Sequence, residues 1–305
     1  MRVFITGATG FIGSATVSEL IEAGHQVTGL ARSDAGAAAL VAAGAAVHRG
    51  SLEDLDSLRR GAAASDGVIH TAFNHDFSVS REVAGEADRQ AIQAMGEALY
   101  GTDRPLIITS GTAVLTPGRV GTEDDPRPSS PLAAARGLSE DLALSMIEQG
   151  VRASVMRFPP SVHGEGDHGF VPRLIEIART SGVSGYIGDG ANRWAAVHRV
   201  DAARLFRLAL ESAPAGTVLH GVADEGVPTR EIAEVIGRHL NVPVVSVAPE
   251  SAEAQFAWLG AFYALDVPAS SALTRERMGW EPTQPGLIGD LDAGHYFRQS
   301  HPQAA

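Results

Sequence analysis

Short apolar runs alternate with amphipathic segments along most of the chain. Parallel strands that helices cover on both faces read as continuous apolar runs, whereas a surface helix shows apolar residues three or four positions apart. On this basis we predict strands at residues 3–6, 25–31, 45–50, 66–72, 104–111, 151–158 and 218–223. We predict helices at residues 11–23, 34–43, 52–62, 81–100, 131–149, 170–182 and 201–212.

The order of these elements predicts an α/β fold with a doubly wound parallel sheet of the Rossmann type, because parallel strands need crossover connections. After residue 158 the pattern loosens into a Gly/His loop at 159–169 and a turn-rich connector at 185–194. We therefore predict a dinucleotide-binding Rossmann domain and a smaller C-terminal substrate lobe. The predicted bounds are 1–165 for the domain, with 195–223 returning to it, and 166–194 and 224–305 for the lobe.

The stretch MRVFITGATGFIGS places Gly7, Gly10 and Gly13 at three-residue intervals where the first strand gives way to the first helix. In a dinucleotide-binding turn, the first glycine permits the tight turn and the second lets a pyrophosphate approach the backbone. The third lets the helix pack close to the sheet. The helix N-terminus offers unpaired N–H groups to the phosphates. This context favours nucleotide binding over an ordinary glycine-rich turn.

The end of the second predicted strand indicates which dinucleotide is bound. NAD-selective Rossmann sites hold the ribose 2′-hydroxyl with an acidic residue at this place. This chain has Arg32 and Ser33 there, and Asp34 follows. Because a guanidinium can form two hydrogen bonds to one phosphate, we expect NADP as the cofactor. NAD is the alternative, if Asp34 turns toward the ribose or Arg32 points into solvent.

Six motifs, taken in order, resemble the short-chain dehydrogenase/reductase superfamily. They are TGATGFIG (6–13), DGVIHTA (66–72), IITSGTAV (107–114), RFPPSVHGEG (157–166), WAAVHRVDAARL (194–205) and MGWEPT (278–283). The chain is most similar to the extended and atypical, epimerase/dehydratase-like members, which include nucleotide-sugar epimerases, dehydratases and ketone reductases. The resemblance implies a Rossmann fold, an NAD(P) cofactor and a C-terminal substrate lobe.

The resemblance also implies cofactor contacts beyond the glycine turn. Family members place residues after the third strand at the adenine and residues after the fourth strand beside the nicotinamide ribose, although both segments could equally be ordinary strand ends. The implied cofactor residues are Thr6, Gly7, Thr9, Gly10, Phe11, Ile12, Gly13, Arg32, Ser33, Ser51, Leu52, Thr71, Ala72, Phe73, Arg136 and Pro159.

The catalytic helix of the family is present at residues 131–149, but its Tyr-x-x-x-Lys motif is replaced. In family reductases the tyrosine transfers a proton, and the lysine lowers the pKa of that tyrosine. A glutamate often follows four residues after the lysine. Counting back from Glu140 gives Arg136 at the lysine position and Leu132 at the tyrosine position. Leucine cannot transfer a proton, and Arg136 can bind ribose hydroxyls but is not a practical acid at neutral pH.

Another residue must then supply the proton. Two loops follow sheet strands, where ligands bind in open α/β folds, and a histidine there could act as a general acid. Histidine and aspartate in such loops also serve as caps or face solvent. The candidates are His75, Asp76, His163 and His168, with Tyr186 in the lobe.

The sequence TSGT places hydroxyl groups at the family's serine or threonine position at the end of the fifth strand. Ser110 and Thr112 fall at or next to this position, and Gly111 is the alternative occupant. A hydroxyl there would hold a substrate carbonyl or carboxyl oxygen. The structural alternative is a polar turn at the end of a strand.

Composition excludes several classes of protein. The 305 residues carry a net charge of −12 and include no cysteine. We therefore expect no nucleic-acid or anionic-membrane partner, no disulfide and no thiolate-bound metal. His163 and His168 are not paired on one helix face, so we expect no metal. No apolar segment is long enough to span a bilayer and a strand begins near Met1, so we expect no signal peptide and a cytoplasmic location.

Three functions remain after these exclusions. The first is an NADP-dependent oxidoreductase of a small carbonyl or alcohol substrate with a non-standard proton donor. Its candidate catalytic residues are Ser110, Thr112, Arg136, His75 and His163. The second is a catalytically inactive NADP(H)-binding sensor or regulator. The third is a nucleotide-sugar epimerase or dehydratase, in which a diphosphate could contact Arg173, Arg179 and Arg193.

Two further expectations concern the oligomeric state and the N-cap of one helix. Extended family members often dimerise through the helices that correspond to 81–100 and 131–149, so we leave a homodimer open. Asp201 is expected to be the N-cap of the helix at 202–212, because an aspartate oxygen can accept from the first free N–H groups.

Overall fold

The computed structural model describes residues 1–74, 79–126 and 131–298, and of residues 131–134 it describes the backbone alone. Within these residues seven parallel strands form the central sheet, in the order β10-β6-β5-β4-β1-β2-β3. The order reverses between β1 and β4, as in other Rossmann folds. This confirms the predicted fold class. The strands are β1 (Arg2–Thr6), β2 (Gln26–Ala31), β3 (Ala46–Arg49), β4 (Gly67–His70), β5 (Pro105–Gly111), β6 (Arg152–Phe158) and β10 (Val218–His220).

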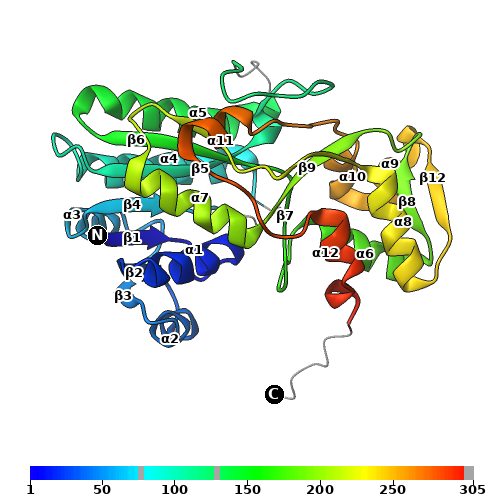
Figure 1. Ribbon diagram of the computed structural model, residues 1–305, viewed down its shortest axis with the longest axis horizontal. Coiled ribbons are helices and arrows are strands. Elements are labelled where there is room, and N and C mark those ends of the chain that lie inside the picture. Colours follow the sequence, from blue (N-terminus) through cyan, green and yellow to red (C-terminus); the bar gives the residue numbers. More distant parts are fainter. Residues whose placement is uncertain (75–78, 127–130, 299–305) are drawn as a thin grey trace.

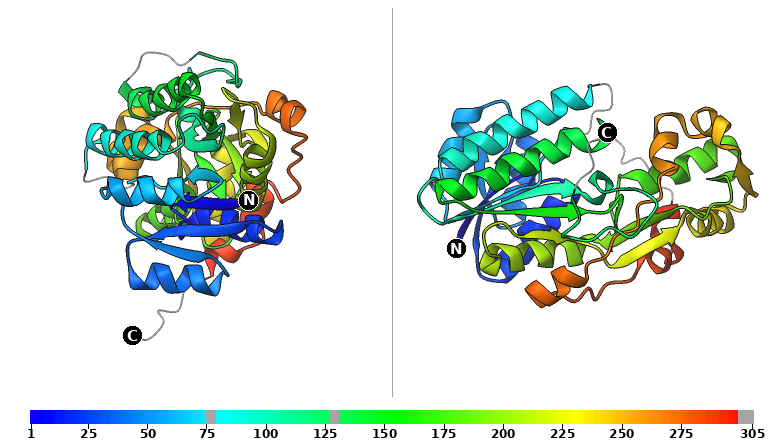
Figure 2. Two further views of the ribbon diagram at one scale, coloured as in Figure 1. Left: turned by 90° about the vertical axis from the view of Figure 1, so that its left-hand side faces the viewer. Right: turned by 90° about the horizontal axis from the view of Figure 1, so that it is seen from above.

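Helices cover both faces of this sheet (Figure 2). Helices α1 and α7 pack against each other on one face, and α3, α4 and α5 pack side by side on the other. The predicted helices of this domain are all present. Their bounds are α1 (Phe11–Glu22), α2 (Asp34–Ala42), α3 (Leu55–Ala63), α4 (Arg81–Glu97), α5 (Pro131–Ser145) and α7 (Arg199–Ser212), with α11 (Ala272–Met278) beside β10.

Side chains of the strands alternate between two apolar cores, because successive residues of a strand point to opposite faces. Val3 and Ile5 of β1 join the core under α1 and α7. Phe4, which lies between them, joins the core under α3 and α4. All three are fully buried. Burial on both faces explains why these strands read as continuous apolar runs.

The C-terminal lobe lies beyond the carboxyl ends of the central strands (Figure 1). It has its own core, which includes Trp194, Phe256 and Tyr263. Its small sheets have the orders β11-β9-β7 and β12-β8. The elements are β7 (Ser161–His163), β8 (Ser184–Ile187), β9 (Arg193–His198), β11 (Asp224–Pro228), β12 (Val244–Val247), α6 (Phe170–Ser181), α8 (Thr229–Leu240), α9 (Ala252–Phe256), α10 (Gly260–Tyr263) and α12 (Leu287–Asp292).

Short 3₁₀ helices join several of these elements. They are η1 (Thr112–Val114), η2 (Met146–Gln149), η3 (Pro249–Ser251), η4 (Ala257–Leu259) and η5 (His295–Phe297).

Two predicted irregular segments contain strands. The predicted loop at 159–169 includes β7, which pairs with β9 in parallel register. The predicted connector at 185–194 overlaps the end of β8 and the start of β9. These strands are three to six residues long, and their hydrogen-bond partners come from remote parts of the chain, so the local pattern was too short to reveal them.

The prediction that Asp201 caps its helix is wrong. The N-cap of α7 is His198, whose ring accepts from the N–H of Val200. Asp201 is buried in the first helical turn and accepts from the backbone N–H groups of Thr283 and Gln284, at 2.9 Å and 3.0 Å. A partner about eighty residues away, which local sequence does not indicate, therefore decides the role of this carboxylate.

Candidate functional site

The glycine turn has the geometry that its spacing predicts. Gly7 leaves β1 with φ +69°, a conformation that L side chains rarely adopt. A Cβ atom on Gly13 would lie 2.0 Å from the carbonyl oxygen of Gly7. Only a residue without a side chain lets α1 approach the turn this closely. The tight packing directs the N-terminus of α1 toward the carboxyl edge of the sheet.

The same turn leaves room and hydrogen-bond donors for a phosphate. Gly10 is the N-cap of α1, and no side-chain hydrogen bond caps the helix there. A Cβ on Gly10 would meet just one described atom within 4 Å, the carbonyl oxygen of Gly7 at 3.1 Å. An uncapped helix N-terminus with an open side attracts an anion through its N–H groups and its dipole. The residues present therefore fit the pyrophosphate of a dinucleotide.

The ends of β1 and β4 meet at this turn. The hydroxyl of Thr71 donates to the carbonyl oxygen of Thr6 at 2.7 Å. The N–H of Ala72 donates to the hydroxyl of Thr6 at 3.4 Å. A Cβ on Gly7 would lie 2.6 Å from that same N–H nitrogen. Four of the predicted cofactor residues thus lie around one corner.

Arg32 and Asp34, the two charged residues that follow β2 and bear on the choice between NAD and NADP, have different neighbours. Arg32 is exposed, and its charge, together with a hydrogen bond from Ser51, lowers the pKa of Glu53. Ser33 caps α2, since its hydroxyl accepts from the N–H of Gly36 at 3.1 Å. Asp34 forms an ion pair with Arg49 at the end of β3. Ser51 and Arg32 therefore both act on Glu53, whereas Asp34 pairs with another cation.

Arg136 of α5 takes the place of the family lysine in sequence and lies close to the end of β5. Its Nη1 donates to the carbonyl oxygen of Thr109 at 3.1 Å, and its guanidinium carbon lies 3.5 Å from the centroid of the Phe73 ring. Burial lowers the pKa of Arg136, while the carboxylates of Asp88 and Glu140 act in the opposite direction. The guanidinium remains charged. It is placed to bind hydroxyl groups.

Two hydroxyls of the TSGT sequence are buried at the end of β5. Ser110 is 4% exposed and Thr112 is 1% exposed. Neither side-chain oxygen has a hydrogen-bond partner among the residues that the structure describes. Buried hydroxyls normally have a partner, so both can bind another group. Gly111 lies between them, and Pro159 is buried just after the neighbouring strand β6.

A buried network that sequence reasoning missed joins the glycine turn to the catalytic helix. Nε2 of His70 lies 3.0 Å from Oδ1 of Asp88, and the hydroxyl of Ser139 donates to Oδ2 at 2.6 Å. The other ring nitrogen of His70 lies 2.6 Å from the hydroxyl of Thr6. Because a carboxylate only accepts, Nε2 carries the proton and Nδ1 accepts from Thr6. The motif DGVIHTA contains His70, but no local signal marks Asp88.

His163 lies inside the molecule rather than in the crevice. It is fully buried, and its Nδ1 lies 2.8 Å from Oδ2 of Asp290. Its Nε2 has no partner among the described residues. Burial raises the pKa of Asp290, but hydrogen bonds from His163 and His295 outweigh it, so the pKa lies below its usual value. His163 thus ties β7 to the C-terminal segment.

His168 lies closer to the expected phosphates. Its ring packs edge-on against Phe11 of the glycine turn, with the centroids 5.9 Å apart. Arg199 lies over the Phe11 ring, with its guanidinium carbon 5.1 Å from the ring centroid. The hydroxyl of Tyr296 donates to Asp167 and accepts from the N–H of Gly164. The C-terminal segment therefore holds the loop that contacts the turn.

The remaining predicted site residues divide into two groups. His75 and Asp76 lie outside the described residues, and so does the side chain of Leu132. The others have partners within the lobe. Arg230 donates to the hydroxyl of Tyr186, Arg173 pairs with Glu176, Arg179 donates to the carbonyl oxygen of Phe297, and Arg193 pairs with Asp266.

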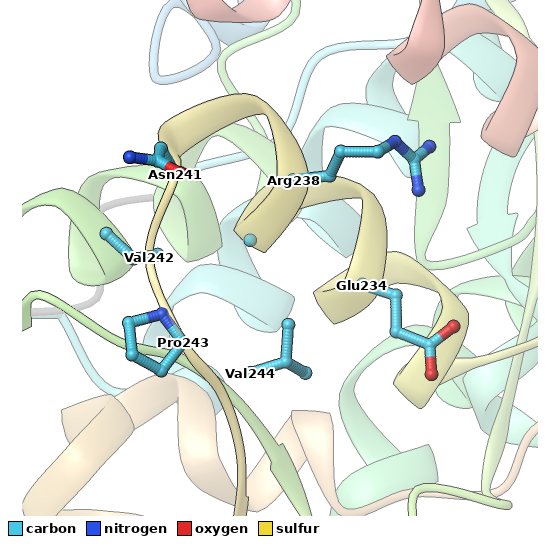
Figure 3. A pocket seen from close by; sticks show the side chains of 7 residues that line it. Glu234, Arg238, Asn241, Val242, Pro243 and Val244 are labelled. Atoms are coloured by element: carbon cyan, nitrogen blue, oxygen red, sulfur yellow. The ribbon is translucent and has the colours of Figure 1, made fainter.

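A surface pocket at the far end of the lobe lacks the features of this crevice (Figure 3). Seven residues at the end of α8 and the start of β12 line it, from Glu234 to Val244. No strand of the central sheet contributes to it. We therefore locate the candidate site at the carboxyl edge of the central sheet.

The described residues show neither a cluster of metal ligands nor a membrane-spanning helix. Among residues 1–74, 79–126 and 131–298, no three His, Asp or Glu side chains gather as a metal site requires. In the same ranges, none of the helices combines the length and the apolar character needed to cross a membrane.

Comparison with known proteins agrees with the turn, the sheet and the lobe. Residues 3–220 match the NAD dependent epimerase/dehydratase family. The chain belongs to this family. An uncharacterized protein of Schizosaccharomyces pombe is 54% identical over 97% of this chain and 100% of its own length. The 4-hydroxy-2-methyl-3-oxo-4-farnesyl-3,4-dihydroquinoline-1-oxide ketoreductase of Stigmatella aurantiaca is 29% identical over 72% of this chain and 67% of its own length.

A solved structure shares the whole architecture. The dTDP-glucose 4,6-dehydratase of Streptomyces venezuelae, determined with NAD and TYD bound, has a TM-score of 0.79 and 22% identity, and covers 98% of both chains. Family membership confirms the predicted superfamily and a nicotinamide dinucleotide cofactor. It also supports an enzyme of the NAD(P)-dependent oxidoreductase or epimerase type.

Proposed function

We propose that this protein is an NADP-dependent oxidoreductase that reduces the carbonyl group of a small apolar molecule or oxidises the corresponding alcohol. The observation that carries the proposal is the juxtaposition of two features at one sheet edge. One is the uncapped glycine turn, and the other is Arg136 stacked on Phe73. The first suits a pyrophosphate, and the second suits a ribose.

The choice of NADP rests on charge. Arg32 and Ser51 both act on Glu53 at the ends of β2 and β3, and a guanidinium there can bind a 2′-phosphate. Asp34 is engaged by Arg49, so it is not available to hold a 2′-hydroxyl in the manner of NAD-selective sites. These contacts favour the phosphorylated cofactor.

The bound dinucleotide would supply the hydride chemistry. Arg136 would hold the ribose hydroxyls through the positive charge that replaces the family lysine. The hydroxyl of Ser110 would hold the substrate oxygen, because it is buried and unbonded among the described side chains at the end of β5. The Ser110 hydroxyl would therefore offer a hydrogen-bond donor to the substrate although the family tyrosine is absent.

An aromatic group in the lobe favours an apolar substrate. Phe170, Trp258 and Phe262 pack together, and Arg81 of α4 lies 4.6 Å from the Phe262 ring. This contact brings the group to the boundary between the lobe and the Rossmann domain. The arginines that could have held a sugar diphosphate have other partners. The name of the Stigmatella relative, a ketoreductase, agrees with this preference.

The test has two steps. Calorimetry with NADPH and NADH first measures binding, and we expect NADPH to bind more tightly. Absorbance of NADPH then follows reduction of a panel of ketones and aldehydes, with apolar and aromatic members expected to react. Tight binding without oxidation of NADPH by any compound would instead favour the sensor or regulator. Absence of heat with either dinucleotide would overturn the proposal.

We also propose that the protein acts as a cytoplasmic homodimer, with small molecules as its other partners. Val83 of α4 and Leu138 of α5 are 60% and 50% exposed, and these helices pack side by side. Two apolar side chains on neighbouring helices suit a second copy of the same surface. The chain has no cysteine, so it does not depend on an oxidising compartment.

A further inference from the structure

Several buried polar atoms, beginning with the Ser110 and Thr112 hydroxyls of the candidate site, form none of the hydrogen bonds described above. Each of these atoms lacks a hydrogen-bond partner within the described part of the chain. The residues that carry them are at most 4% exposed. The atoms are Ser110 Oγ, Thr112 Oγ1, Arg157 Nη1, His220 Nε2 and Glu123 Oε2. Buried polar groups without a protein partner are commonly satisfied by ordered water.

Strand register places three of these side chains in line. Ser110 of β5 pairs with Arg157 of β6, and Arg157 pairs with His220 of β10. Side chains in register on parallel strands point to the same face, and neighbouring strands lie about 4.8 Å apart. Arg157 contacts Glu140 of α5, which identifies the face as the α5 side. The row therefore runs across the sheet from the site to the edge strand.

The free atoms of Arg157 and Glu123 are complementary. The Nε and Nη2 groups of Arg157 donate to the two oxygens of Glu140, at 3.1 Å and 2.7 Å, so Nη1 is left to donate elsewhere. Oε1 of Glu123 accepts from the N–H and the hydroxyl of Thr274, so Oε2 is left as an acceptor.

The tautomer of His220 follows from its other partner. Its Nδ1 lies 2.8 Å from the carbonyl oxygen of Ser270, and since a carbonyl only accepts, Nδ1 carries the proton. Burial lowers the pKa of His220, so the ring is neutral at pH 7 and Nε2 is an acceptor. The charged groups that act on the ring are Glu123, Arg157 and Glu140. One donor and two acceptors match a water that makes about three hydrogen bonds.

A surface pocket adjoins Glu123 at the far end of the row. Glu123 and Asp124 line a surface pocket together with Thr217, Val218 and Arg277. Glu123 thus carries an unpartnered buried oxygen and also contributes to the lining of this pocket. At the near end, Ser110 follows Thr109, whose carbonyl oxygen accepts from Arg136.

We propose that ordered waters along this row connect the Ser110 hydroxyl with solvent at Glu123, and that this path replaces the missing tyrosine as the source of the proton. The inference rests on the proposed reductase function. The bound dinucleotide would supply a hydride to the carbonyl carbon, and Ser110 Oγ would give its proton to the carbonyl oxygen. A proton from the adjacent water restores the serine hydroxyl, and solvent replaces that proton through Glu123. One proton and one hydride are consumed for each alcohol formed.

A crystal structure of the full-length protein at atomic resolution tests the path without any turnover. We expect ordered waters within hydrogen-bond distance of Arg157 Nη1, His220 Nε2 and Glu123 Oε2, continuing to Ser110 Oγ. A dry row, or a gap that separates Ser110 from Glu123, would overturn the path.

Steady-state kinetics of matched variants test whether the proton path contributes to turnover. Glu123→Gln keeps the acceptor for Thr274 but replaces the free oxygen with a donor, and Ser110→Ala removes the near end. For a carbonyl that the wild type reduces, we expect kcat to fall on the order of 10²-fold in both variants, with the Kd for NADPH unchanged in both and KM unchanged in Glu123→Gln. The solvent deuterium isotope effect on kcat should rise in Glu123→Gln. The control is Asp124→Asn, which lines the same pocket on its exposed side and should keep the wild-type kcat.

The possible outcomes distinguish a failure of the proton path from a failure of the proposed reductase function. Wild-type kcat in Glu123→Gln overturns the proton path even if the row is hydrated. A wild type that binds NADPH and reduces no carbonyl overturns the reductase proposal and, with it, the catalytic use of the row. If Glu123→Gln does not fold, Ser110→Ala and the crystal structure decide.

Discussion

Arg32 and Asp34 lie two residues apart at the end of β2 and carry opposite charges, yet their surroundings differ. The charge of Arg32 acts on Glu53, which also accepts a hydrogen bond from Ser51. Asp34 is fully exposed and pairs with Arg49. The chain alone left open which of the two would face the nucleotide. We therefore propose that Arg32, rather than Asp34, faces the nucleotide and binds its 2′-phosphate.

Replacing Arg32 therefore tests the nucleotide preference at the scale of one residue. In Arg32→Ala we expect the Kd for NADPH to rise about 10- to 100-fold, because a hydrogen bond to a charged group contributes about 1.5–3 kcal/mol. The Kd for NADH should not change, since NADH has no 2′-phosphate. Calorimetry with both dinucleotides measures the two values.

Arg59→Ala is the matched control, because Arg59 is a surface arginine of α3 that pairs with Asp56 and Glu97. It should bind both dinucleotides as the wild type does. An equal loss of NADPH and NADH affinity in Arg32→Ala would show that the side chain acts on the shared part of the cofactor.

At the scale of elements, Asp88 joins α4 to its neighbours. It accepts from His70 at the end of β4 and from Ser139 of α5, and it lies 3.9 Å from the guanidinium of Arg136. Burial raises the pKa of Asp88, but the hydrogen bonds from His70 and Ser139 and the positive charge of Arg136 outweigh this effect. The pKa therefore lies below the usual value for an aspartate.

Asp88→Asn should lower the free energy of unfolding at pH 7 by about 2–3 kcal/mol, because hydrogen bonds to a charged group are lost. A depressed folded-state pKa stabilises the protein above the unfolded-state pKa of about 3.9, and this contribution is lost as pH falls further. The difference between wild type and variant should thus stay constant from pH 7 to about pH 5 and narrow below about pH 4. Urea unfolding followed by circular dichroism measures it.

Asp56→Asn provides the comparison for this experiment, since Asp56 is 81% exposed and pairs with Arg59 on the surface of α3. Its stability should stay close to that of the wild type, because exposed ion pairs contribute little. A pH-independent difference between Asp88→Asn and the wild type would mean that packing, rather than charge, makes Asp88 important.

At the scale of the whole molecule, the site forms where the two parts of the chain meet. The central strands end toward the lobe (Figure 1), and the C-terminal segment reaches back through Tyr296 to the loop beside Phe11. One face of the Rossmann domain carries α4 and α5, on which Val83 and Leu138 are exposed. This arrangement leaves the helical face free for a second copy.

Leu138→Lys should convert the expected dimer into a monomer, because it places two like charges near the symmetry axis of the α4–α5 face. Sedimentation velocity over a range of concentrations measures the oligomeric state. Val41→Lys is the control, because Val41 is 65% exposed on α2 and lies outside the proposed interface. A monomeric wild type, or a Leu138→Lys variant that remains a dimer, would refute the proposed interface.

By itself, the sequence determined the succession of strands and helices, the glycine turn and the absence of a tyrosine on the catalytic helix. These features depend on residues within a few positions of one another, so periodicity and spacing reveal them. Tertiary structure decided the rest. It joined Asp88 to His70, buried His163 against Asp290, engaged Asp201 with Thr283 and aligned Ser110 with Arg157 and His220. Partners that lie 18 to 127 residues apart meet because of how strands are ordered and lobes are packed, which no local pattern encodes.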